Sequence, residues 1–152
     1  MSLAIPQPVQ YPKSILASAE SYVALDIETT GLNPAQEQIL ELAAARMEHG
    51  KLVERFSQLI NPGVKIPAFI TDLTGIRDDM VAGAPKIIDA LPAFLNFLGD
   101  SLLLGHNTAF DLRFIRYNSM VVLKHRVMNP YMDTLRISRL LFPDLPNHKL
   151  TT

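Results

Sequence analysis

The sequence predicts a single α/β domain, built on a mixed β-sheet flanked by helices. The chain has 152 residues, of which 48% are hydrophobic, and this is enough for one buried core. Three extended stretches come first, followed by a helix, a further strand and more helices, so strands and helices do not alternate one by one as in a βαβ fold. No glycine-rich dinucleotide fingerprint or phosphate loop is present, so a nucleotide-binding fold has no support.

The first part of the chain predicts an arm followed by three strands. Residues 1–20 contain recurrent prolines and no sustained periodicity, so we expect an N-terminal arm or linker before a domain over residues 21–152. The apolar run SYVALDI, residues 21–27, is typical of a buried strand. Two extended stretches follow within residues 38–63, and the His49-Gly50 pair between them predicts a hairpin turn.

The second part predicts four helices and one more strand. Residues 67–76 predict a short helix, and residues 84–100 a longer one with apolar side chains at helical spacing. The run SLLLGH, residues 101–106, predicts another short buried strand. Amphipathic helices are expected from Ala109 and from Met132.

Composition excludes several classes of protein. The chain has no cysteine, so it has no disulfide, thiolate metal site or cysteine nucleophile. No apolar run approaches the roughly 18 residues that span a bilayer, and the N-terminus lacks a basic signal-peptide region, so we expect a cytoplasmic protein. Residues 1–111 hold 7 basic and 13 acidic side chains, whereas residues 112–152 hold 7 and 2. This asymmetry suits a polyanionic ligand held over metal ions, although ordinary surface variation explains it equally.

Two carboxylates at the end of the first predicted strand are the most informative residues. Asp26 and Glu28 are two positions apart, and strand side chains two apart project from the same face. Buried charge must be paired, solvated or bound to metal, because burial without compensation is costly. The alternative is that both carboxylates lie in water beyond the strand end. For an isolated Asp-x-Glu pair that alternative is the favoured one; the following TTGL, with two hydroxyls and a flexible glycine, reduces the preference considerably.

A second cluster, GHNTAFD, follows the strand at residues 101–106. It carries Asp111 near the start of a predicted helix, and strand-to-helix turns are where α/β proteins usually build their sites. Taken alone, Asp111 is also explained as a first-turn acid favoured by the helix dipole. Beside Asp26 and Glu28 it completes an all-oxygen cluster suited to Mg²⁺ or Mn²⁺. Two such ions about 4 Å apart can activate a water and stabilise a leaving oxygen in phosphodiester cleavage.

These motifs carry a family resemblance. DIETTGL, LTGI, GHNTAFDLRF and MDTLRISRLLFP, in this order, resemble the DEDDh family of 3′–5′ exonucleases. That family includes the proofreading epsilon subunit of DNA polymerase III and exonuclease domains fused to helicases. The resemblance implies a ribonuclease-H-like fold, two divalent ions (Mg²⁺ or Mn²⁺), and release of nucleoside 5′-monophosphates from a DNA 3′ end.

The resemblance also implies roles for particular residues. By position, Asp26, Glu28 and Asp111 match catalytic metal ligands. The matching substrate-binding positions surround the terminal nucleotide or line the path of the strand, and they are Thr29, Thr30, Gly31, Leu32, Leu73, Thr74, Gly75, His106, Asn107 and Phe110. The implied partners are single-stranded or 3′-terminal DNA, with RNA equally open, and a polymerase or helicase.

The chain departs from the family pattern near its end. The third motif, a His followed five residues later by an Asp on a last helix, is absent, since the sequence ends at Thr152. We therefore expect the natural product to continue past Thr152. We also expect this chain to lack the C-terminal helix and to self-associate over the vacant sheet face. Asp133 is interpreted as a helix N-cap and not as a substitute ligand.

Two other functions stay open. A fragment without the third motif fits a non-catalytic docking module that binds nucleic acid within a polymerase or helicase assembly. Another ribonuclease-H-like enzyme, such as an endonuclease, is the third option. Internal cleavage of a circular single strand separates that option from an exonuclease.

Overall fold

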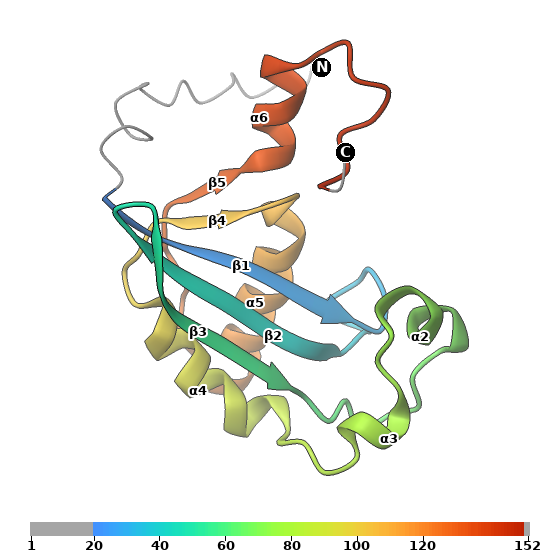
Figure 1. The fold of residues 1–152 in the computed structure, drawn as a ribbon. Coiled ribbons are helices and arrows are strands. Elements are labelled where there is room, and N and C mark those ends of the chain that lie inside the picture. Colours follow the sequence, from blue (N-terminus) through green and yellow to red (C-terminus); the bar gives the residue numbers. More distant parts are fainter. Residues whose placement is uncertain (1–19, 151–152) are drawn as a thin grey trace, which may run out of the picture.

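The computed structural model describes residues 20–150, and a five-stranded sheet organises them (Figure 1). The strands are β1 (Ser21–Thr29), β2 (Ile39–Glu48), β3 (Lys51–Leu59), β4 (Leu103–Gly105) and β5 (Tyr131–Asp133). Their order in the sheet is β3-β2-β1-β4-β5. The pairs β1–β2 and β2–β3 are antiparallel, whereas β1–β4 and β4–β5 are parallel, so the sheet is mixed as the sequence predicts. The predicted arm falls almost wholly outside the described residues.

Five helices accompany the sheet in the described residues. They are α2 (Ala68–Thr74), α3 (Asp78–Val81), α4 (Ile87–Leu98), α5 (Thr108–Leu123) and α6 (Thr134–Leu141). None of the helices between residues 20 and 150 is long and apolar enough to cross a membrane.

Two expectations for individual elements are corrected. The segment from Met132 was expected to be helical at once, but Tyr131–Asp133 pairs with β4 as β5 and the helix starts at Thr134. The sequence analysis also did not identify the single turn α3. In contrast, the hairpin turn at His49-Gly50 is confirmed, and both residues have positive φ there.

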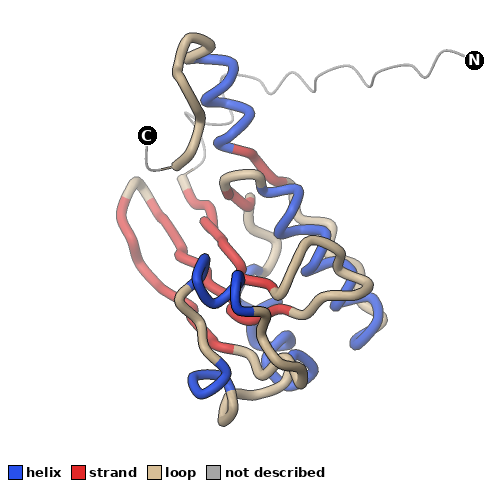
Figure 2. The backbone as a smooth tube through the Cα atoms, turned by 90° about the vertical axis from the view of Figure 1, so that its right-hand side faces the viewer, coloured by secondary structure: helices blue, strands red, loops and turns tan. Residues whose placement is uncertain are grey.

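One face of the sheet carries the main core. Alternate residues of β1, namely Val23, Leu25 and Ile27, are at most 5% exposed and pack with Phe94 of α4 and Phe114 of α5. Figure 2 shows α5 running along this side of the strands. A smaller cluster of apolar residues lies under α2 and α3, and it consists of Leu40, Ile66, Ile70, Ile76 and Val81.

The opposite face of the sheet is left without a covering helix in the described residues (Figures 1 and 2). Small side chains line this face at its centre. Ala24 of β1 is paired with Ala45 of β2, and Asp26 is paired with Ala43. Ala24, Ala43 and Ala45 are only partly buried. The same strand therefore presents apolar residues to the core and its two carboxylates to this open face.

Candidate active site

Asp26 and Glu28 lie together on the open face of β1, as the two-residue spacing predicts. Asp26 is exposed and Glu28 is half-buried. Partial burial is the main cause that raises the pKa of Asp26, with Glu41 adding to it and His106 opposing it. Burial likewise raises the pKa of Glu28, and the charges of Asp26 and Glu41 add to that effect. Burial and the charge of Glu41 therefore raise the pKa of both carboxylates.

Asp111 joins them from α5, 84 residues along the chain from Ile27. Asp111 is 3% exposed, and its Oδ1 accepts a hydrogen bond of 3.0 Å from the backbone N–H of Ile27, which lies between Asp26 and Glu28 in the sequence. The pKa of Asp111 is raised to about 7, chiefly by burial; the charges of Asp26 and Glu28 add to the rise, and the hydrogen bond from Ile27 opposes it. The three carboxylates singled out in the sequence are thus neighbours in the fold.

Glu41 is a fourth acid beside this cluster that the sequence analysis missed. It is the Cα partner of Glu28 across the β1–β2 ladder, so the two side chains share the open face. Its charge contributes to the raised pKa values of both Asp26 and Glu28. The hydroxyl of Ser57 on β3 donates to Glu41 Oε1 at 3.2 Å. Only the register between β1 and β2 identifies this neighbour, and no local sequence pattern determines that register.

The Gly105–Thr108 turn is held to the end of β5 and the start of α6. Asn107 has a left-handed backbone, with φ of 67°, and its N–H donates to Asp133 Oδ1 at 2.9 Å. The same oxygen accepts from Leu135 N, so the prediction that Asp133 caps a helix is confirmed. The hydroxyl of Thr108 donates to the carbonyl of Met132 at 2.8 Å. Asp133 therefore holds the turn that precedes α5 and also caps the start of α6.

The ring of His106 is oriented by Thr134. The Thr134 hydroxyl donates its single hydrogen to the carbonyl of Gly105, and the same oxygen lies 3.0 Å from His106 Nδ1. Nδ1 must therefore be the donor in that contact, which assigns the proton to Nδ1 and leaves Nε2 as an acceptor when the ring is neutral.

The other predicted substrate residues divide into exposed and internal ones. Leu32 and Leu73 are 77% and 79% exposed. Thr29 and Thr30 are buried, and their hydroxyls are used inside the protein, by Gly31 O and Glu37 Oε2 respectively.

Of the four remaining substrate candidates, Gly31 accepts from Thr29 as described above, and the other three have local contacts of their own. Thr74 donates to the carbonyl of Ile70 at 2.8 Å, and Gly75 ends α2 with φ of 76°. Phe110 is half-buried, with its ring centroid 5.2 Å from that of Phe114.

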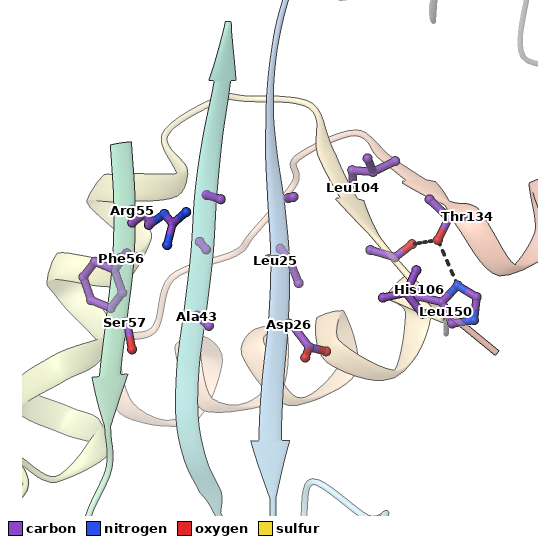
Figure 3. A pocket seen from close by; sticks show the side chains of 14 residues that line it. Leu25, Asp26, Ala43, Arg55, Phe56, Ser57, Leu104, His106, Thr134 and Leu150 are labelled. Carbon is purple, nitrogen blue, oxygen red and sulfur yellow. Dashed lines mark hydrogen bonds between the residues drawn. The ribbon is translucent and has the colours of Figure 1, made fainter. Parts of the chain in front are cut away.

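A hollow of about 490 Å³ opens on the face that carries Asp26. In Figure 3 Asp26 lies between Ser57 of β3 and His106 at the end of β4. Alanines of β1 and β2 form the floor, and Leu150 lines the rim. The hollow is therefore mostly apolar beside Asp26, and it is large enough for a small ligand group or an apolar side chain.

Comparison with known proteins decides the family. The RNase_T model, described as an exonuclease, matches residues 23–152. The chain belongs to the RNase_T exonuclease family. The DEDDh resemblance found in the motifs is thereby confirmed, and with it the assignment of the chain as an exonuclease domain.

Relatives and solved structures agree with this assignment. The DNA polymerase III PolC-type of Clostridium perfringens is 44% identical over 131 residues, which cover 86% of this chain and 9% of that protein. The PolC-type enzyme of Bacillus subtilis is 38% identical over 138 residues, covering 90% and 10%. The chain thus spans about a tenth of the length of these relatives.

Exonuclease X, solved in complex with 5′-overhanging duplex DNA, superposes with a TM-score of 0.65 at 27% identity, covering 82% of this chain and 66% of that one. Product-bound exonuclease I gives a TM-score of 0.72 at 19% identity, covering 82% and 33%. The predicted ribonuclease-H-like sheet flanked by helices is therefore confirmed.

Exonucleases of this family generally use divalent metal ions, and the oxygen donors of Asp26, Glu28 and Asp111 suit a hard divalent cation. Nevertheless, no three acidic or histidine side chains among residues 20–150 are arranged as a ready-made metal cluster. Asp111 instead turns one oxygen to the N–H of Ile27. The donor chemistry of the three carboxylates fits such an ion, while their arrangement in this structure does not enclose one.

Proposed function

We propose that this domain is a metal-dependent 3′–5′ exonuclease that removes nucleoside 5′-monophosphates from DNA. The observation that carries the proposal is the meeting of Asp26, Glu28 and Asp111 from β1 and α5. Each of the three has a raised pKa, and acids with perturbed pKa values cluster at functional sites.

In this proposal the three carboxylates hold Mg²⁺ or Mn²⁺, with two ions in a complete site. The chemistry that such ions supply when bound is activation of the attacking water and stabilisation of the leaving oxygen. Asp26 and Glu28 present their carboxylates from the rigid end of β1, and Asp111 presents its own from the first turn of α5. Because Asp111 is half protonated near pH 7, binding of a cation must displace a proton there.

The substrate side of the proposal uses side chains at positions that match the family's substrate contacts. Leu32 and Leu73 offer apolar surface to the terminal base and sugar. His106 offers Nε2 as an acceptor on the same face as Asp26. The other candidates contribute by fixing the conformation of the backbone that carries these side chains. They are Thr29, Thr30, Gly31, Thr74, Gly75, Asn107 and Phe110.

For the wider protein, we propose residues 21–152 as an exonuclease domain that works beside a DNA polymerase or helicase in the cytoplasm. The PolC-type relatives are DNA polymerases, and the matched region is a small part of each. Exonuclease X was solved with DNA, which favours DNA over RNA as the substrate class.

One observation favours a second candidate, a non-catalytic module that binds nucleic acid. The described residues contain no three-ligand metal cluster. Binding of DNA that depends on divalent metal, without any shortened product, would identify this second function.

The test of the proposed function is a nuclease assay on a 5′-labelled single-stranded DNA with Mn²⁺. The wild-type chain, Asp26→Ala and the matched control Asp100→Ala are compared, since Asp100 is an exposed acid between α4 and β4. We expect a ladder that shortens from the 3′ end for the wild type and for Asp100→Ala but not for Asp26→Ala. Internal cleavage, or equal activity of all three chains, contradicts the proposal.

A further inference from the structure

The loop that joins β1 to β2 is closed at Thr30. The N–H of Thr30 donates to the carbonyl of Gln38, and the N–H of Gln38 donates to Thr30 Oγ1, both at 2.9 Å. The Thr30 hydroxyl then donates to Glu37 Oε2 at 2.5 Å. Because Thr30 is 3% exposed, its hydroxyl depends on protein partners, and Glu37 is the acceptor for its hydrogen.

Glu37 also explains the glycine at position 31. A Cβ at Gly31 would lie 2.7 Å from Glu37 Cδ and 2.9 Å from its Cγ. Both distances are shorter than van der Waals contact allows, so a side chain at position 31 would push Glu37 off Thr30. Glycine at position 31 therefore leaves the Glu37 side chain free to stay on Thr30.

Glu37 is itself held in place by the same loop. Its N–H donates to the carbonyl of Asn33 at 2.8 Å, and the Asn33 side chain accepts from the N–H of Ala35 at 3.1 Å. On the other side of Gly31, the hydroxyl of Thr29 donates to the Gly31 carbonyl at 2.7 Å. These contacts fix residues 29–31 from both sides and leave Leu32 exposed beyond them.

We infer that Glu37 is a positioning residue for the terminal-nucleotide loop, holding residues 29–32 in the shape that receives the 3′-terminal nucleotide. The inference rests on the proposed function, which assigns that loop to the substrate. Glu37 acts through Thr30 and Gly31, because its carboxylate binds the Thr30 hydroxyl and packs against the Gly31 backbone. A fixed loop lowers the ordering required on binding, so Glu37 acts on substrate affinity more than on the chemical step.

The test measures affinity for thymidine 5′-monophosphate in Mn²⁺ together with kcat and KM on single-stranded DNA. Glu37→Ala is expected to weaken monophosphate binding and raise KM by about tenfold, with kcat changed less than about twofold. Glu37→Gln keeps an oxygen acceptor for Thr30, so it is expected to restore most of the affinity. Gln36→Ala, an exposed neighbour in the same loop, serves as the matched control and is expected to match the wild type.

A double-mutant cycle makes the test specific for the contact. Gly31→Ala alone is expected to weaken monophosphate binding, and adding Glu37→Ala to it is expected to cause little further loss. Purely additive losses, or a folded Glu37→Ala chain with unchanged KM and monophosphate affinity, overturn the inference. Thermal unfolding of each variant separates loop effects from loss of the fold. A wild-type chain that neither binds the monophosphate nor shortens DNA overturns the proposed function itself, before any variant is compared.

Discussion

The two faces of the sheet use the same strands for opposite purposes. On the covered face, Val23, Leu25 and Ile27 pack against α4 and α5 and are almost wholly buried. On the open face, the intervening Ala24, Asp26 and Glu28 carry small or charged side chains, and the carboxylates have raised pKa values. Because side chains alternate along the strand, residues that pack in the core are next in sequence to residues of the candidate site. Substitutions on the covered face are expected to act on folding, and those on the open face on function.

The largest effect on stability is expected on the covered face. Phe114→Ala removes a fully buried ring of α5, and we expect it to lower the free energy of unfolding by about 3–5 kcal/mol. Ala45→Ser, on the open face, is the control and is expected to change it by less than about 0.5 kcal/mol. Urea unfolding measures both. Similar losses for the two variants would show that the open face is packed as tightly as the covered one.

The second prediction concerns Asp111, which links the two faces. Its folded pKa is about 7, above that of an unfolded aspartate, so the folded state binds the extra proton between about pH 4 and 7. Stability of the metal-free chain should therefore fall as pH rises through that window. Asp111→Asn keeps the oxygen that accepts from Ile27 and removes the charge, so we expect a gain of about 2–4 kcal/mol at pH 8 and none at pH 4. Unfolding in EDTA at the two pH values measures this, and an equal effect at both would contradict the raised pKa.

A smaller effect on stability is expected from Asp133, which holds the turn before α5 and caps α6. Asp133→Ala removes the cap of α6 and the acceptor for the N–H of Asn107, which we expect to lower the unfolding free energy by about 1–2 kcal/mol. Asp144→Ala, an exposed acid after α6, is the control. Equal stability of the two variants would mean that Asp133 does not hold this turn.

The smallest effect is expected from Thr134→Val. It removes the acceptor for His106 Nδ1 and lowers the unfolding free energy by about 1 kcal/mol. Nitrogen chemical shifts of the ring should show a proton on Nδ1 in the wild type and a mixture of tautomers in the variant. A wild-type ring protonated on Nε2 would refute the assignment made from the Thr134 hydroxyl.

Much of the fold and of the site could be predicted from the sequence, for local reasons. The alternation in SYVALDIET fixes which residues of β1 face the core, and the short spacing of Asp26 and Glu28 fixes their common face. Tyr131–Asp133 was missed as a strand because three residues are too few to show a period and a helix follows at once.

The contacts between residues that lie far apart in the sequence could not be predicted from it. Glu41 became part of the site through the β1–β2 register, which no local pattern determines. The link from Thr30 to Glu37 depends on how a loop folds back, and the raised pKa of Asp111 depends on burial by elements far away in the sequence. These features follow from tertiary packing, and they are the ones that tune the site.

The central claim is that Asp26, Glu28 and Asp111 hold a divalent cation on the open face. Calorimetric titration with Mn²⁺ at pH 6 and pH 8 tests it most directly, with the wild type, Asp111→Asn, Asp26→Asn and the control Asp100→Asn. The account predicts wild-type binding that tightens about tenfold from pH 6 to pH 8, as the proton leaves Asp111, and loss of binding in the first two variants but not in the control. Binding that is independent of pH and equally strong in all four chains would contradict it.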